Sequence, residues 1–132
     1  MKKPIIFIQG TGTYSNEIIV ASGATQEQIL KYCKMQRMSK DGLEFVKKEE
    51  VFEHFKKSKA CVIPDEKGRA IILLEPFEDS WKFWEILIHE LHHYTMYFME
   101  WKNMKDEIEA LAYLQEFLFH SIRRKLQKVD KI

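Results

Sequence analysis

The stretch WKFWEILIHELHHYTMYFMEW, residues 81–101, is the part of this sequence that decides how the rest is interpreted. It contains His89-Glu90-Leu91-His92-His93, which has the form H-E-x-x-H. Apolar residues recur at helical spacing through the stretch, and no Gly or Pro interrupts it. Asp79 or Ser80 is placed to cap its start. The stretch is therefore predicted to form one continuous helix.

The motif has the spacing of a metal site. Residues four apart share one face of a helix, so His89 and His93 can bind the same ion. Zinc accepts imidazole ligands readily, and a catalytic zinc takes three protein ligands and keeps one position open for water. Glu90 lies beside the pair and can act as a general base. The pattern predicts a zinc site, and the alternative is an amphipathic helix with surface histidines.

A third ligand has to come from the polar turn after residue 101 or from the helix that follows it. The candidates are Glu107, Glu109 and Glu116, with His120 as a further possibility. Glu107 falls within an apolar face, where an unpaired carboxylate is costly and a metal would remove the cost. A tight antiparallel helix pair brings Glu116 level with the motif, whereas Glu109 reaches it only if the helices cross or the first one ends early.

Composition indicates one globular domain. The chain has 132 residues, 31% of them charged and 13% aromatic, which is enough for a core and too apolar for disorder. The net charge of +1 argues against a nucleic-acid partner. Cys33 and Cys61 have neither metal-ligand nor redox spacing, and we expect a reduced, cytoplasmic protein, with a secreted protein that contains one disulfide as the alternative. No stretch is long enough to cross a membrane, so no membrane partner is expected.

The remaining pattern predicts an α+β fold. Residues 5–8 and 17–21 are expected to be short strands, separated by a turn at Gly10 and Gly12. A capping box at residues 25–28 opens a helix to about residue 38, and Asp41-Gly42 is expected to break the chain. A further helix spans residues 47–59, where His54 is interpreted as a surface residue. The single domain, residues 1–132, is thus divided into N-terminal strands and helices (1–59), a β-hairpin (60–75), the metal helix (80–101) and a C-terminal helix (106–126).

The hairpin before the motif is the clearest β signal. Its second strand, residues 70–74, is apolar on both faces and is expected to be covered on both sides. In zinc peptidases, an exposed strand edge holds the substrate backbone by strand addition. The same use is possible here if the edge of this hairpin is free.

The motif together with Glu109-Ala110-Leu111-Ala112-Tyr113-Leu114 resembles the small zinc metallopeptidases of phages and mobile elements, in the gluzincin-like branch of the zincin superfamily. The resemblance implies a minimal zincin-like domain, with a short sheet or hairpin packed on the H-E-x-x-H helix and a following C-terminal helix. It implies Zn²⁺ as cofactor, His89, His93 and Glu109 as ligands, and Glu90 as general base. The implied substrate is a peptide or protein, and residues 1–59 have no counterpart in the resemblance.

Several functional questions stay open on the sequence. Tyr94, Tyr97, Tyr113 and His120 are all candidates for stabilising an oxyanion, and His92 is expected to lie off the ligand face. Besides a zinc metallopeptidase, the sequence allows an inactive zincin-like binding or regulatory protein of phage origin and a zinc hydrolase that is not a peptidase. It also allows a metal-free interaction protein that docks a partner through Trp81, Trp84 and Trp101.

Overall fold

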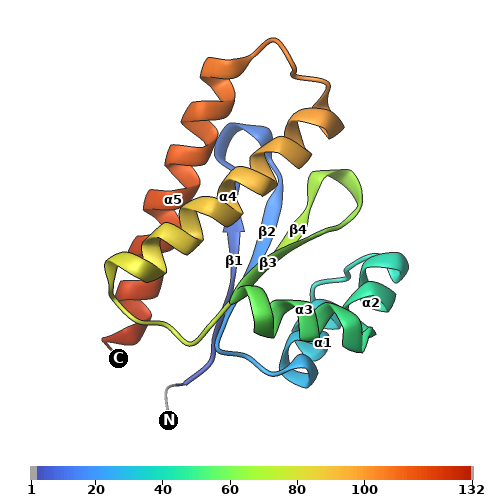
Figure 1. The fold of residues 1–132 in the computed structure, drawn as a ribbon. Helices are drawn as coiled ribbons and strands as arrows, with labels where there is room; N and C mark the ends of the chain where they lie inside the picture. The colour runs from blue at the N-terminus through green and yellow to red at the C-terminus, as the bar shows by residue number, and fades with distance from the viewer. Residues whose placement is uncertain (1–2, 132) are drawn as a thin grey trace.

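The computed structural model describes residues 3–131 and shows an α+β fold (Figure 1). Its elements follow in chain order as β1 (Ile5–Gly10), η1 (Gly12–Tyr14), β2 (Glu17–Ser22), α1 (Gln26–Met35), α2 (Lys40–Lys47), α3 (Glu49–Ser58), β3 (Ala60–Pro64), η2 (Glu66–Gly68), β4 (Ala70–Leu74), α4 (Trp81–Lys102) and α5 (Ile108–Asp130). None of the helices in the described range is long and apolar enough to cross a membrane.

The strands form one mixed sheet in the order β1-β2-β4-β3. The predicted hairpin is confirmed, because β3 and β4 pair antiparallel from Ala60 opposite Leu74 to Pro64 opposite Ala70. The sheet is larger than the hairpin that the sequence indicated. The pair β1–β2 joins β4 through a parallel pairing of β2 with β4, which puts β3 at one edge of the sheet.

Helices cover both faces of this sheet (Figure 1). Ile18, Val20 and Ile72 belong to the core shared with α4 and α5, whereas Ile19 and Ile71 belong to the core shared with α1, α2 and α3. Neighbouring strand residues therefore point to opposite layers, as the period of two requires. All five residues of β4 are buried, which confirms the prediction that this strand is covered on both sides.

The helices between β2 and β3 are only partly as predicted. The capping box that opens α1 is present, with Thr25 accepting from the Gln28 N–H. The prediction that Gly42 interrupts the helical structure is wrong. Gly42 lies inside α2, where its N–H donates to the Ser39 hydroxyl at 3.0 Å. A Cβ there would lie 2.6 Å from Met38 and 2.7 Å from Asp65. The glycine therefore provides a close approach instead of a break.

α4 and α5 form a long antiparallel pair. Ser80 caps α4 by accepting from the Phe83 N–H, and α4 continues to Lys102, after which Asn103 ends it in a left-handed conformation with φ of 55°. Gln127 near the end of α5 donates to Asp79 at 3.1 Å, before the start of α4. The two helices thus lie side by side over most of their lengths, which fixes what each side of α4 can contact.

Candidate functional site

His89 and His93 lie one turn apart on α4 and converge on one point. Their Nε2 atoms are 3.0 Å apart, and both side chains are exposed. Two imidazoles bound to one tetrahedral zinc at about 2.0–2.1 Å have nitrogens about 3.3 Å apart. The observed separation is close to that value, so the pair fits a shared metal ion with little rearrangement. The same separation is also that of a hydrogen bond between the two rings.

Glu90 completes the cluster that the motif predicted. Its carboxylate and the two imidazoles have ligand atoms within 4.8 Å of one another, and among residues 3–131 this is the one group of three or more possible metal ligands at that spacing. Glu90 is only 7% exposed. Burial raises the pKa of its carboxyl, while nearby His93, His89 and His54 act in the opposite direction. A carboxylate with a raised pKa is suited to accept and return a proton.

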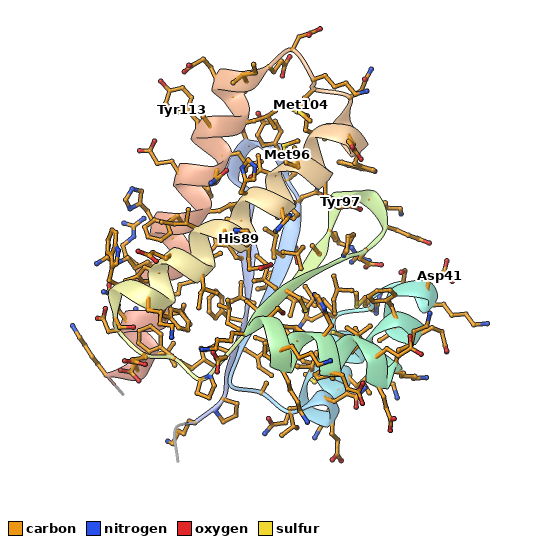
Figure 2. The ribbon with its side chains drawn as sticks, in the orientation of Figure 1. Asp41, His89, Met96, Tyr97, Met104 and Tyr113 are labelled. Carbon is orange, nitrogen blue, oxygen red and sulfur yellow. The ribbon has the colours of Figure 1, made fainter. Side chains whose placement is uncertain are left out.

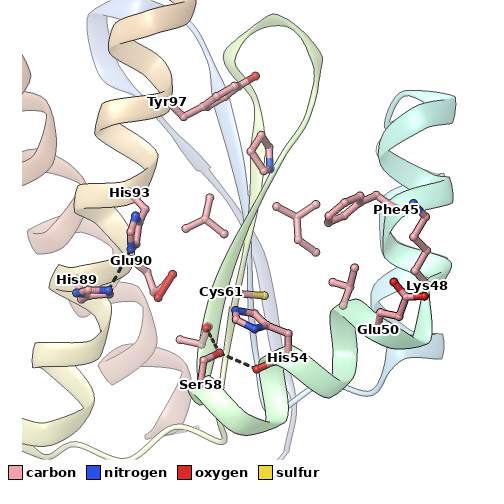
Figure 3. A pocket seen from close by; sticks show the side chains of 15 residues that line it. Phe45, Lys48, Glu50, His54, Ser58, Cys61, His89, Glu90, His93 and Tyr97 are labelled. Atoms are coloured by element: carbon pink, nitrogen blue, oxygen red, sulfur yellow. Dashed lines mark hydrogen bonds between the residues drawn. The ribbon is translucent and has the colours of Figure 1, made fainter.

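The cluster opens into a pocket of about 660 Å³ at the free edge of β3. Figure 3 shows α4 with the cluster on one side of this edge and α3 with His54 on the other. The pocket is lined by residues of α4, β3, α3 and the end of α2, including His89, Glu90, His93, Tyr97, Ala60, Val62, His54, Val51 and Phe45. Its size is in the range of pockets that bind small ligands or short peptide segments.

The register of the sheet shows which backbone groups the pocket exposes. The Asp65 N–H bonds to the Arg69 carbonyl at 2.7 Å, in register with the β3–β4 pairing. Hydrogen-bonded and non-hydrogen-bonded pairs alternate along an antiparallel ladder. The backbone groups of Ala60, Val62 and Pro64 therefore point away from β4. The Ala60 carbonyl already accepts from the Ser58 hydroxyl at 2.7 Å, and proline has no N–H. Among these three described residues, Val62 is therefore the one whose N–H and carbonyl both lack another partner.

His54 and Cys61 line the pocket, although the sequence analysis gave neither of them a role in the site. His54 is exposed, as expected for a surface residue, but it faces the pocket from the wall opposite Glu90 (Figure 3). Burial and the nearby Glu90 charge raise the pKa of the Cys61 thiol to about 12. Both positions depend on how α3 and β3 pack beside α4, and no local sequence pattern carries that information.

The structure does not bring Glu109, the predicted third ligand, to this cluster. Glu109 lies in the first turn of α5, and no α5 side chain within residues 3–131 lines the pocket. α5 packs on another side of α4, where the Trp84 and Phe119 rings are 6.2 Å apart. At about 100° per residue, His93 projects about 180° away from Trp84. Since α4 is uninterrupted between them, the helix itself separates α5 from the pocket.

The other candidates for the third ligand also lie away from the cluster. Glu107 precedes the first turn of α5 as its N-cap residue. Glu116 and His120 line a different pocket, which is formed by side chains of α5 that include Tyr113. Figure 2 shows Tyr113 on the outer side of α5, whereas Tyr97 lies on the side of α4 that faces the β3–β4 loop. None of these α5 groups joins the His89–Glu90–His93 cluster in the described structure.

The predicted oxyanion stabilisers are therefore reduced to one pocket residue. Tyr94 is fully buried, and its hydroxyl donates to the Gly68 carbonyl at 2.7 Å. Tyr97 lines the pocket, but its hydroxyl donates to the Asp65 carbonyl. Both hydroxyls tie α4 to the loop between β3 and β4. His92 is exposed and does not line the pocket, as expected for a residue off the ligand face.

Comparison with protein-family models, with curated proteins and with solved structures found no match to this chain. The resemblance to the zincin superfamily thus rests on the motif residues themselves, and the function has to be argued from the site.

Proposed function

We propose that this protein is a zinc-dependent peptidase that cleaves an extended peptide held at the edge of β3. The observation that supports the proposal is the position of the His89–Glu90–His93 cluster at a free strand edge. A metal cluster alone is compatible with many functions. A free edge beside it adds the means to hold a peptide backbone, because edge strands bind extended peptides through main-chain hydrogen bonds.

Each residue of the site has a distinct role in this proposal. His89 and His93 would hold the zinc, which when bound would act as a Lewis acid and lower the pKa of a water molecule toward neutrality. Glu90 accepts the proton of the attacking water and delivers it to the leaving amine. The N–H and carbonyl of Val62 hold the peptide backbone in register. His54, on the opposite wall, is placed to donate a hydrogen bond to the oxygen of the carbonyl under attack.

The number of protein ligands in the cluster predicts how strongly it binds zinc. Catalytic zinc sites typically have three protein ligands, and the described cluster offers two histidines with Glu90 reserved for proton transfer. We therefore expect weaker zinc binding than in sites with three ligands. The same observation favours the alternative function, an inactive zincin-like binding or regulatory protein that retains the pair of histidines without turnover.

The aromatic docking hypothesis receives little support from the arrangement of the tryptophans. Trp84 is 3% exposed and belongs to the core, while Trp81 and Trp101 are exposed at opposite ends of α4. A common docking face would require the three rings to share one surface.

The first experiment is the zinc content of the purified protein after zinc is added and excess is removed. We expect zinc in the wild type and in Glu109→Ala, and its loss in His93→Ala. Cleavage of a mixed peptide library, with and without a chelator, then separates a peptidase from an inactive binding protein. A wild-type protein that takes up no zinc would overturn both, and loss of zinc in Glu109→Ala would show that α5 reaches the site.

A further inference from the structure

The wall opposite the cluster has an apolar part that the cleavage chemistry does not use. This wall is formed by the end of α2 and by α3, where Phe45 and Val51 line the pocket across the β3 edge from the cluster. The Phe45 side chain is 42% exposed, although it is large and apolar. Lys48 and Glu50 lie beside it in the same lining (Figure 3). An apolar patch with a charged rim is typical of a surface that receives an apolar side chain.

The pleat of β3 shows which part of a bound peptide meets this wall. Val62 packs toward the core under α4 and α5, whereas Ile63 packs toward the core under α1, α2 and α3. A strand added to the edge of β3 continues the same sheet, so its side chains alternate between the α4 layer and the α2–α3 layer. The two residues that flank any peptide bond therefore face different layers, and one of them meets Phe45 and Val51.

We propose that the pocket selects an extended peptide segment whose side chain on the α2–α3 side, next to the bond at the cluster, is large and apolar. This inference rests on the proposed function and adds the substrate class to it. Phe45 and Val51 provide the contact surface, and burying an apolar side chain against them removes apolar area from water. Lys48 lies 5.5 Å from the centre of the Phe45 ring and keeps the rim of the subsite polar.

The free edge favours a peptide over a second copy of this chain as the occupant. Among the described residues of β3 that face this edge, Val62 has both a donor and an acceptor without another partner, since Pro64 lacks an N–H and the Ala60 carbonyl already accepts from Ser58. Two copies joined through this edge would have to form a sheet from one such residue on each side. A flexible peptide can place its side chains against both walls of the pocket. The sheet of a second copy is rigid and cannot adapt its side chains to both walls.

The test measures peptide binding without turnover, using zinc-loaded Glu90→Gln. Fluorescein-labelled octapeptides with a Gly-Ser background carry one Phe, moved through each position, and the matched peptide carries Ser instead. Binding is measured by fluorescence anisotropy. We expect one position at which Phe binds at least about tenfold more tightly than Ser, a difference of about 1.4 kcal/mol. Cleavage of the same peptides by the zinc-loaded wild type, and the position of the cut, tests the proposed function separately.

The variants distinguish the wall from other apolar surfaces. Phe45→Gln with Val51→Thr removes apolar contact at two positions that are not fully buried, and should abolish the preference for Phe. Ile108→Gln is the control, because Ile108 is 73% exposed on α5, away from the pocket, and should leave the preference intact. Circular dichroism of each variant checks folding, and Phe45→Gln alone serves if the double variant unfolds.

The outcomes test the substrate preference and the proposed peptidase function separately. A preference lost only in the pocket variants supports the inference, whether or not the wild type cleaves. Equal binding of Phe and Ser peptides, or a preference that the pocket variants leave unchanged, overturns it even where cleavage is observed. Peptides bound with the preference but never cleaved by the wild type would overturn the peptidase proposal alone. A zinc-loaded protein that forms a dimer through the β3 edge and binds none of the peptides would assign the edge to a second copy and overturn the inference.

Discussion

α4 has two sides with different neighbours. On one side it packs against α5, where the Trp84 ring lies 6.2 Å from Phe119 and 5.1 Å from the Arg123 guanidinium. On the other side it borders an open pocket, and its histidines are exposed. The packed side satisfies its side chains within the molecule, whereas the pocket side leaves ligand atoms available. The comparison shows that side chains on one side of α4 stabilise the fold, whereas side chains on the opposite side remain available to bind a ligand.

The test with the largest expected effect compares a glutamate on the pocket side of α4 with a glutamate on α5. Glu90→Gln should lower kcat for peptide cleavage by about 10²–10⁴-fold, because it removes the proposed general base while keeping the side-chain shape. Glu109→Gln, on α5, should leave kcat unchanged. Zinc content should be normal in both variants, which separates loss of the base from loss of the metal. Similar losses of activity in the two variants would show that α5 contributes to the site.

The second test concerns stability. Leu118 of α5 is fully buried, so Leu118→Ala should lower the free energy of unfolding by about 2–5 kcal/mol. His93→Ala should change it by no more than about 0.5 kcal/mol without metal, as expected for an exposed position. Urea unfolding in the presence of EDTA measures both. If His93→Ala destabilised the metal-free protein as strongly as Leu118→Ala, the pair of histidines would have a structural role.

A smaller effect is expected from the opposite wall of the pocket. His54→Ala should lower kcat by about 10–100-fold, less than a buried oxyanion donor would, because the ring is exposed. Its zinc content and its free energy of unfolding should not change. His120→Ala, on α5, is the matched control and should have normal kinetics. A His54 variant that loses zinc would instead identify this residue as the third ligand.

The smallest effect concerns the contact that joins α4 to the β3–β4 loop. Tyr94→Phe removes a hydroxyl that donates to the Gly68 carbonyl in a buried position. Leaving that carbonyl without its donor should cost about 1–3 kcal/mol of unfolding free energy. Tyr97→Phe should cost less, because the Asp65 carbonyl that it frees lies in a partly buried contact. Equal costs in thermal or urea unfolding would show that burial does not distinguish these two contacts.

The sequence predicted the features that depend on neighbours in the chain. The cap at Thr25, the apolar runs and turn of the β3–β4 hairpin and the convergence of His89 with His93 all follow from spacings of a few residues. These interactions are local, so the helical or strand period determines them. The two converging histidines and the glutamate beside them belong to this group.

Features that depend on packing between distant segments were harder to predict. The parallel pairing of β2 with β4 and the placement of His54 across the pocket join segments with no common local pattern. The position of Glu109, apart from the cluster, has a different origin. The apolar stripe through Trp84 and Leu91 already pointed away from His93 by about 160–180°, as the helical period requires. The family resemblance supplied Glu109 as a ligand, and the rotation of the helix did not support it.

If the protein is the peptidase proposed above, the short free edge of β3 limits which targets it can cleave. An added strand needs its own backbone groups unpaired, and in a native globular protein nearly all buried backbone groups are already paired. A target segment would therefore become available only where it is disordered or while its own fold opens locally. When opening and closing are fast, the cleavage rate follows the fraction of time that the segment is open. The stability of the target, as much as its sequence, would then determine how long it survives beside this protein.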